Sequence, residues 1–203
     1  MSQETSLRRN TGINGWDFAA VSRGWLAGIM GLLFLAGSAR GQVASVFPQG
    51  TMTLTSYGSY AHNFDGERVM IGTANVGAGY YIFKNFALNF EAGYQRHDQR
   101  GTNADVTMLD ILLRHHLFHV GRASFFVDFG VGVSYANART PRDGTYFNFM
   151  EEAGLGSTFQ LKDHLHLLGG VRFFHMSNAR IDGPARNPSI NATQVYVGVL
   201  FKL

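Results

Sequence analysis

The chain has 203 residues, which is enough for one domain of ordinary size and short for two. Charged residues make up 15% of it, below the roughly one quarter typical of soluble proteins, whereas aromatic residues reach 13% and glycine occurs 25 times. The absence of cysteine excludes disulfide bonds and thiolate chemistry. The net charge of +3 falls to about +1 without residues 1–41, so there is no reason to expect a nucleic-acid partner.

Residues 1–41 have the composition of an export signal. Three arginines precede an apolar run at 25–36, and small residues follow it. The run has 12 residues, which is short for a membrane-spanning helix of about 20 residues. We therefore expect a signal peptide over 1–41 that is cleaved close to Gly41, and the alternative is a membrane anchor that is retained.

After residue 41 the sequence alternates between apolar and polar positions. In 86–95 the even positions are apolar or aromatic, and in 125–135 the odd positions hold only Phe, Val and Tyr. A period of two indicates strands with one apolar face. About eight such segments are expected, near 51–62, 67–82, 86–98, 104–117, 123–137, 145–160, 165–178 and 192–203.

The links between these segments alternate between tight turns and longer polar loops, which is typical of outer-membrane barrels. Tight turns are expected near 84–85, 119–122 and 162–163, and longer loops near 63–66, 99–104, 138–144 and 179–191. We therefore predict an all-β fold, an eight-stranded antiparallel transmembrane β-barrel that forms a single domain over 42–203. Closing the barrel leaves no unpaired strand edge in lipid.

A soluble barrel that binds a ligand inside is the alternative, and its apolar face would point inward. One face of the predicted strands holds glycines and polar or charged residues, among them Asn89, Glu91, Asp110, Arg114, Asp128, Glu152 and Arg172. The other face is nearly all Phe, Leu, Val and Tyr. A polar interior and an apolar outer band favour the membrane barrel.

His175 and Ser177 lie near the end of the seventh predicted strand. They are two residues apart, so they point to the same face, and that face also carries Val171 and Phe173. If both chain ends lie in the periplasm, this end of the strand is level with the outer leaflet. A histidine beside a hydroxyl can act as base and nucleophile, and its place among lipid-facing residues indicates a lipid substrate.

The same stretch resembles a known family. The run His175, Met176, Ser177, Asn178 and Ala179, followed by Asn187 and Pro188 and by a closing amphipathic strand, is similar to PagL, the outer-membrane lipid A 3-O-deacylases. The resemblance implies an esterase of the bacterial outer membrane that cleaves the acyl chain at position 3 of lipid A in lipopolysaccharide. It makes Ser177 the nucleophile and His175 its general base.

Two asparagines are candidate donors for the oxyanion that forms when an ester is attacked. Asn187 is preferred, because its loop could fold the amide over the ester. Asn178 follows Ser177 directly and should point to the other face, so its alternative role is to hold the loop.

The group that orients His175 has two candidates. The family places a glutamate a few residues after Asn-Pro, but Ser189–Thr193 contains no acid, and Asn191 is the nearest match. A tight turn between the sixth and seventh strands puts Glu151 opposite or next to His175, with residue sums near 325 or 326. A charge that faces lipid is costly unless paired, so Glu151 is preferred. The alternative is a bulge that turns Glu151 inward.

No metal or other cofactor is expected. His115 and His116 are adjacent and point to opposite faces of a strand, so they and His119 do not make a metal site. The loop arginines at 139, 142, 180 and 186 form a solvated rim, or as a group contact lipid A phosphates.

Three functions remain open at this level. The first is the esterase, with lipid A as substrate and the outer membrane as its location. The second is a non-catalytic structural or adhesin-like barrel whose site has degenerated, which the missing glutamate favours. An acyltransferase is disfavoured because no separate acceptor site is evident. The sequence leaves open whether the protein is a monomer or a homodimer.

Overall fold

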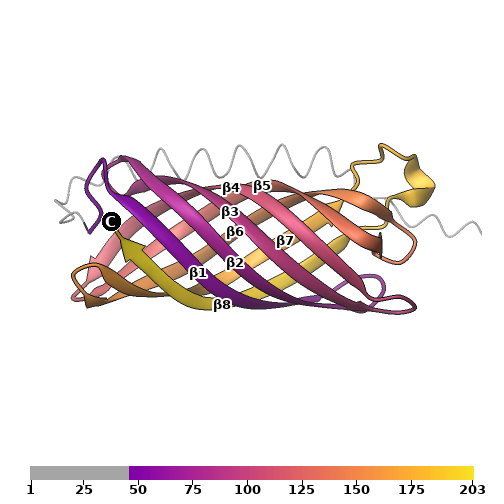
Figure 1. Ribbon diagram of the computed structural model, residues 1–203, viewed down its shortest axis with the longest axis horizontal. Coiled ribbons are helices and arrows are strands. Elements are labelled where there is room, and N and C mark those ends of the chain that lie inside the picture. Colours follow the sequence, from indigo (N-terminus) through magenta and orange to yellow (C-terminus); the bar gives the residue numbers. More distant parts are fainter. Residues whose placement is uncertain (1–45) are drawn as a thin grey trace, which may run out of the picture. The chain divides into compact units, whose positions relative to one another are not determined.

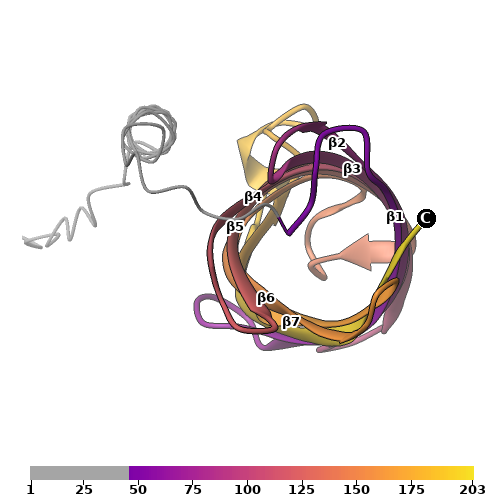
Figure 2. The ribbon, with the colours of Figure 1, turned by 90° about the vertical axis from the view of Figure 1, so that its left-hand side faces the viewer.

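The computed structural model describes residues 46–203, which contain a closed barrel of eight antiparallel strands (Figures 1 and 2). The strands are β1 (Met52–Asn63), β2 (Val69–Phe83), β3 (Phe86–Gln99), β4 (Ala104–Val120), β5 (Ala123–Thr140), β6 (Thr145–Lys162), β7 (Leu165–Ser177) and β8 (Ile190–Lys202). The predicted fold class is confirmed, and each expected segment is a strand. The expected signal peptide, 1–41, lies outside the described residues. Within 46–203 no helix is long and apolar enough to cross a membrane.

The connections differ between the two ends of the barrel. Two-residue turns join β2 to β3, β4 to β5 and β6 to β7, at the end where the C-terminus lies (Figure 1). Asn85 and Gly121 in two of these turns have φ angles of 61° and 56°, the left-handed conformation that tight hairpin turns require. The longer loops lie at the other end, and the β7–β8 loop there contains a short 3-10 helix, η1 (Pro184–Arg186).

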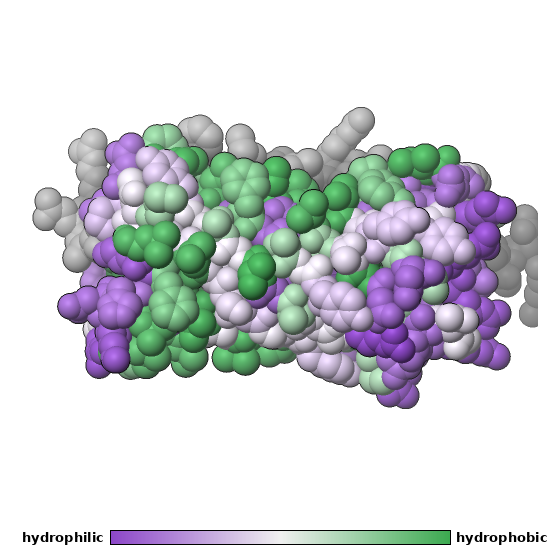
Figure 3. Space-filling view, in the orientation of Figure 1, coloured by the Kyte–Doolittle hydropathy of each residue, from purple (hydrophilic) through white to green (hydrophobic). Residues whose placement is uncertain are grey.

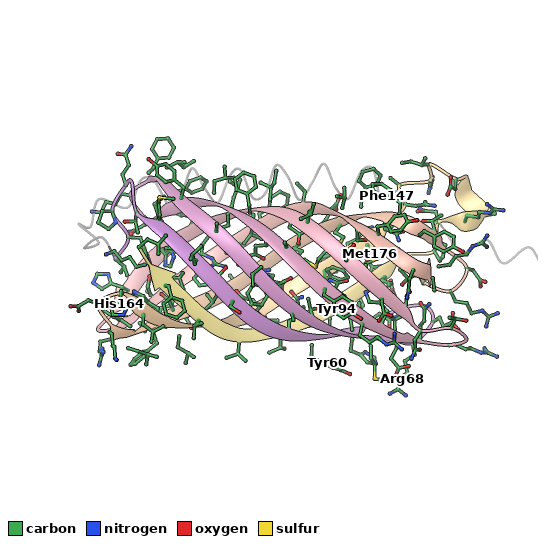
Figure 4. All side chains as sticks on the ribbon, in the orientation of Figure 1. Tyr60, Arg68, Tyr94, Phe147, His164 and Met176 are labelled. Carbon is green, nitrogen blue, oxygen red and sulfur yellow. The ribbon has the colours of Figure 1, made fainter. Side chains whose placement is uncertain are left out.

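Side chains alternate between the outer surface and the interior along every strand. In β3, Phe90 and Tyr94 are 57% and 51% exposed, whereas Asn89, Glu91 and Gln95 are buried. Apolar side chains cover the part of the wall nearer the short turns, and polar side chains gather at the end with the long loops (Figure 3). The exposed side chains of Tyr60, Tyr94 and Phe147 lie in the half of the barrel nearer that polar end (Figure 4). An apolar band bordered by aromatic residues is the outer surface of a membrane barrel.

The interior is filled by a charged network. The Arg172 guanidinium donates to Glu152 Oε2 and Asp128 Oδ2, each at 2.9 Å. Arg114 forms a two-pronged ion pair with Asp128, at 2.8 and 2.9 Å. Large apolar side chains occupy the rest: one buried cluster includes Met150, Phe174, Met176 and Ile190, and another includes Phe47, Tyr81, Phe126 and Leu168. The predicted polar interior is thus present. It also contains apolar clusters, which the small and polar residues on the inner face of the predicted strands did not indicate. Both kinds of contact stabilise the strands that carry the site.

Candidate active site

His175 and Ser177 lie at the end of β7, on the outer surface of the barrel. Both are partly exposed, as are the outward-facing residues before them, whereas Phe174 and Met176 point inward and are 1% and 0% exposed. The Nε2 atom of His175 is 3.2 Å from the hydroxyl oxygen of Ser177. The alternation of the strand therefore places an imidazole and a hydroxyl within proton-sharing distance on the face that meets lipid.

Two residues flank His175 in the sheet, Glu151 on β6 and Asn191 on β8. Directly opposite residues on antiparallel strands share a face, so all three side chains point outward. The Oδ1 atom of Asn191 lies 2.6 Å from Nδ1 of His175. An amide oxygen only accepts hydrogen bonds, so Nδ1 carries the hydrogen and Nε2 of the neutral ring is left to accept the Ser177 proton.

Glu151 stands where the hairpin register predicts. It pairs with His175, it is exposed, and the next residue, Glu152, is the buried one. A bulge that turns Glu151 inward is therefore absent at this point of β6. Within residues 46–203, however, the Glu151 carboxylate makes no hydrogen bond or ion pair, and the hydrogen bond at Nδ1 of His175 goes to Asn191. In this structure Nδ1 of His175 is hydrogen-bonded to a residue of β8, and Glu151 on β6 remains a candidate by its position alone.

Asp65, in the loop between β1 and β2, extends this arrangement. The Nδ2 group of Asn191 donates to Asp65 Oδ2 at 2.7 Å. The backbone N–H of Phe64 donates to the Asn191 carbonyl at 2.9 Å, which fixes the loop against β8. The sequence analysis did not identify Asp65. Its proximity to Asn191 follows from the pairing of β1 with β8, in which Asn63 lies opposite Ala192.

The loop after Ser177 is held by Asn178. Its Nδ2 donates to the Arg186 carbonyl, and its Oδ1 accepts from the backbone N–H of Arg180, both at 2.9 Å. Asn178 is 3% exposed, so its side chain is committed to the loop. Of the two roles considered for it, this geometry matches the second.

Asn187 contacts the residue that follows Ser177, and the backbone of Ala179 contacts the Ser177 hydroxyl. The Oδ1 atom of Asn187 accepts the backbone N–H of Asn178 at 3.0 Å, and this bond orients the amide. Within the described part of the chain, Nδ2 of Asn187 has no protein acceptor and remains able to donate. The backbone N–H of Ala179, whose φ is 52°, lies 3.5 Å from the Ser177 oxygen.

Aromatic side chains surround the pair on the outer wall. Phe149 lies opposite Ser177 on β6 and packs edge-on against Phe147, with ring centroids 5.3 Å apart. On the same face of β7, the ring of Phe173 packs near the ring of Phe64, with ring centroids 6.0 Å apart. All four rings are exposed by 37% or more. The hydroxyl therefore opens onto an apolar surface.

The histidines near the short turns lie apart from this site. His116 is buried and bonds Tyr81 and Ser124 near the short-turn end. Among residues 46–203, no three His, Asp or Glu side chains are grouped so that they could hold a metal ion. The loop arginines at 139, 142, 180 and 186 are exposed at the long-loop end.

A family comparison agrees with this geometry. Residues 84–199, more than half of the chain, match the model of the family described as lipid A 3-O-deacylase (PagL). The chain belongs to the PagL family. The matched range contains His175, Ser177, Glu151 and Asn191 but not Asp65. No curated protein matches the chain.

Several solved structures of outer-membrane barrels share this fold. The crystal structure of the outer-membrane enzyme PagL is 18% identical with a TM-score of 0.53, and the match covers 72% of this chain and 99% of that one. Neisserial surface protein A is 12% identical with a TM-score of 0.54, covering 75% and 96%. Outer membrane protein W of E. coli is 10% identical with a TM-score of 0.55, covering 77% and 99%. This PagL-family barrel is a protein of the bacterial outer membrane.

Proposed function

We propose that the protein hydrolyses the 3-O-linked acyl ester of lipid A in the outer leaflet, with Ser177 as nucleophile and His175 as general base. The observation that carries the proposal is the His175–Ser177 contact of 3.2 Å on the outward face of β7. Delivery to this location requires an export signal, for which residues 1–41 are our candidate.

The chemistry follows from the ring nitrogens. The Ser177 hydroxyl attacks the ester carbonyl while its proton moves to Nε2 of His175. The tetrahedral intermediate collapses when the carbonyl re-forms and the bond between the acyl carbon and the sugar oxygen breaks. The Nε2 proton goes to the departing sugar oxygen, which leaves as a hydroxyl. Water, activated by the same nitrogen, then releases the fatty acid from Ser177.

The negative charge on the intermediate needs donors that are already in place. Asn187 Nδ2 and the Ala179 N–H are our candidates, because one is oriented by a hydrogen bond and the other lies near the Ser177 oxygen. Asn178 supports them by holding the loop.

The apolar surroundings support a membrane substrate. A soluble ester would require a water-filled cleft, whereas Ser177 lies opposite the exposed ring of Phe149, and the exposed ring of Phe173 lies on the same face of β7. An acyl chain that is already in the leaflet can lie along these rings without leaving its apolar environment.

The test is the composition of lipid A. Cells that express the wild-type protein should yield lipid A lacking one 3-O-linked hydroxyacyl chain by mass spectrometry, and cells that express Ser177→Ala should not. Gel migration with and without heating checks that both barrels are folded. Unchanged lipid A with a folded wild-type barrel would instead favour a non-catalytic barrel, and loss of a chain from another position would refute the 3-O assignment.

A further inference from the structure

We propose that Asp65 is a positioning residue of the active site: through Asn191, it sets the orientation of the amide that determines which nitrogen of His175 carries the hydrogen. This inference rests on the proposed roles of Ser177 and His175. It gives the site a carboxylate from the β1–β2 loop, 126 residues before Asn191 and outside the matched range 84–199.

The amide of Asn191 has two possible orientations. One orientation turns Oδ1 toward His175 and Nδ2 toward Asp65, as observed, at 2.6 and 2.7 Å. The reversed orientation would place Oδ1 against the carboxylate. An ionised carboxylate only accepts hydrogen bonds, so two acceptors would meet and repel. Asp65 therefore selects the observed orientation.

The selected orientation decides the tautomer of His175. With Oδ1 facing Nδ1, the ring must carry its hydrogen there, and Nε2, which then carries no hydrogen, can accept the Ser177 proton. With the amide reversed, Nδ2 would donate to Nδ1, and the neutral ring would carry its hydrogen on Nε2. A histidine in that form is not a base for Ser177.

The charge of Asp65 has a second effect on the same hydrogen bond. A negative acceptor polarises the amide that donates to it, and linked hydrogen bonds strengthen one another in this way. Asn191 is 5% exposed, so the polarised amide is largely shielded from water. When His175 takes the Ser177 proton, the positive ring faces an amide oxygen backed by a carboxylate. This compensates in part for the lack of a carboxylate at position 191 itself.

The loop holds Asp65 in this place with independent contacts. Phe64 donates its backbone N–H to the Asn191 carbonyl and packs its ring near Phe173. The Asn63 side chain donates to the backbone carbonyls of Asp65 and Glu67 and accepts from the N–H of Val69. A carboxylate held on both sides by backbone contacts can orient a partner without reordering the loop at each turnover.

The first experiment compares variants of the full-length barrel on lipid A vesicles. Asp65→Asn should lower kcat about tenfold and leave KM within about twofold, because a hydrogen bond to a charged partner is lost and no substrate contact changes. Asp65→Glu should restore part of the loss. Glu67→Gln removes the same charge from the same loop without touching Asn191, so it should retain wild-type activity. Equal losses in Asp65→Asn and Glu67→Gln would overturn the proposal.

In the Asn191→Asp variant, the effect of Asp65→Asn on kcat should no longer be a decrease. In Asn191→Asp, a carboxylate accepts the Nδ1 hydrogen directly, and Asp65 becomes a like-charged neighbour. Adding Asp65→Asn to Asn191→Asp should then raise kcat or leave it unchanged. If Asp65 merely supports the loop, its replacement would lower kcat by the same factor in both backgrounds, and the proposal would be wrong.

A readout independent of turnover separates this inference from the proposed function. The ¹⁵N chemical shifts of the His175 ring, assigned by comparison with His175→Gln, should report hydrogen on Nδ1 in the wild type and a mixture of tautomers in Asp65→Asn. Lipid A left intact by a wild-type barrel that shows the Nδ1–H form would refute the proposed function and support the role of Asp65. Hydrolysis with the same tautomer in wild type and Asp65→Asn would refute the role of Asp65 alone.

Discussion

Replacing Asn191 by alanine tests which flanking strand orients His175. The change removes the acceptor that lies 2.6 Å from Nδ1, and Asp65 loses its link to the site. The hydrogen bond becomes charge-assisted when His175 is protonated during the reaction, so its loss should cost about 1.5–3 kcal/mol. This corresponds to a decrease of roughly 10- to 100-fold in kcat.

Glu151→Gln is the matched change on the other flank. The Glu151 carboxylate also lies opposite His175, but it is exposed and has no hydrogen bond within residues 46–203. Interactions between exposed charges contribute at most about 1 kcal/mol, so kcat should fall by about fivefold or less.

The assay is release of fatty acid from lipid A vesicles by purified, folded barrels, with kcat and KM determined separately. Folding is checked by heat-dependent gel migration, because Asn191 is buried against the β1–β2 loop. A greater loss of activity in Glu151→Gln than in Asn191→Ala would refute the assignment of Asn191 as the residue that orients His175. That result would mean that the β6 carboxylate orients the imidazole during turnover.

Three further predictions concern the oxyanion donor, the apolar wall and the interior. Asn187→Asp keeps the oxygen that accepts the N–H of Asn178 but replaces the free donor by an acceptor, so kcat should fall about 100-fold or more; activity near the wild-type level would exclude Asn187 as the oxyanion donor. Phe149→Ala removes apolar surface beside Ser177 and should raise KM about fivefold with little effect on kcat, whereas an unchanged KM would place the acyl chain elsewhere. Arg172→Met leaves buried carboxylates without their cation and should lower the free energy of unfolding by about 3–5 kcal/mol in urea titrations; a loss under about 1 kcal/mol would show that the interior charges are not coupled.

Local patterns in the sequence determined the strands, the two faces of the wall and the outward pair on β7. His175 and Ser177 are two residues apart, and a period of two needs no knowledge of the rest of the fold. The position of Glu151 opposite His175 was also predictable, because a tight turn fixes the register of the hairpin that it closes.

Only the tertiary structure showed which residue is hydrogen-bonded to Nδ1 of His175. The contact between Asp65 and Asn191 joins residues 126 positions apart, and β1 and β8 are paired with no turn between them. Their register follows from the stagger of the whole closed barrel, to which every strand contributes. The closure of the barrel therefore brings a carboxylate in a polar loop within hydrogen-bond distance of Asn191, and no single stretch of the sequence specifies this contact.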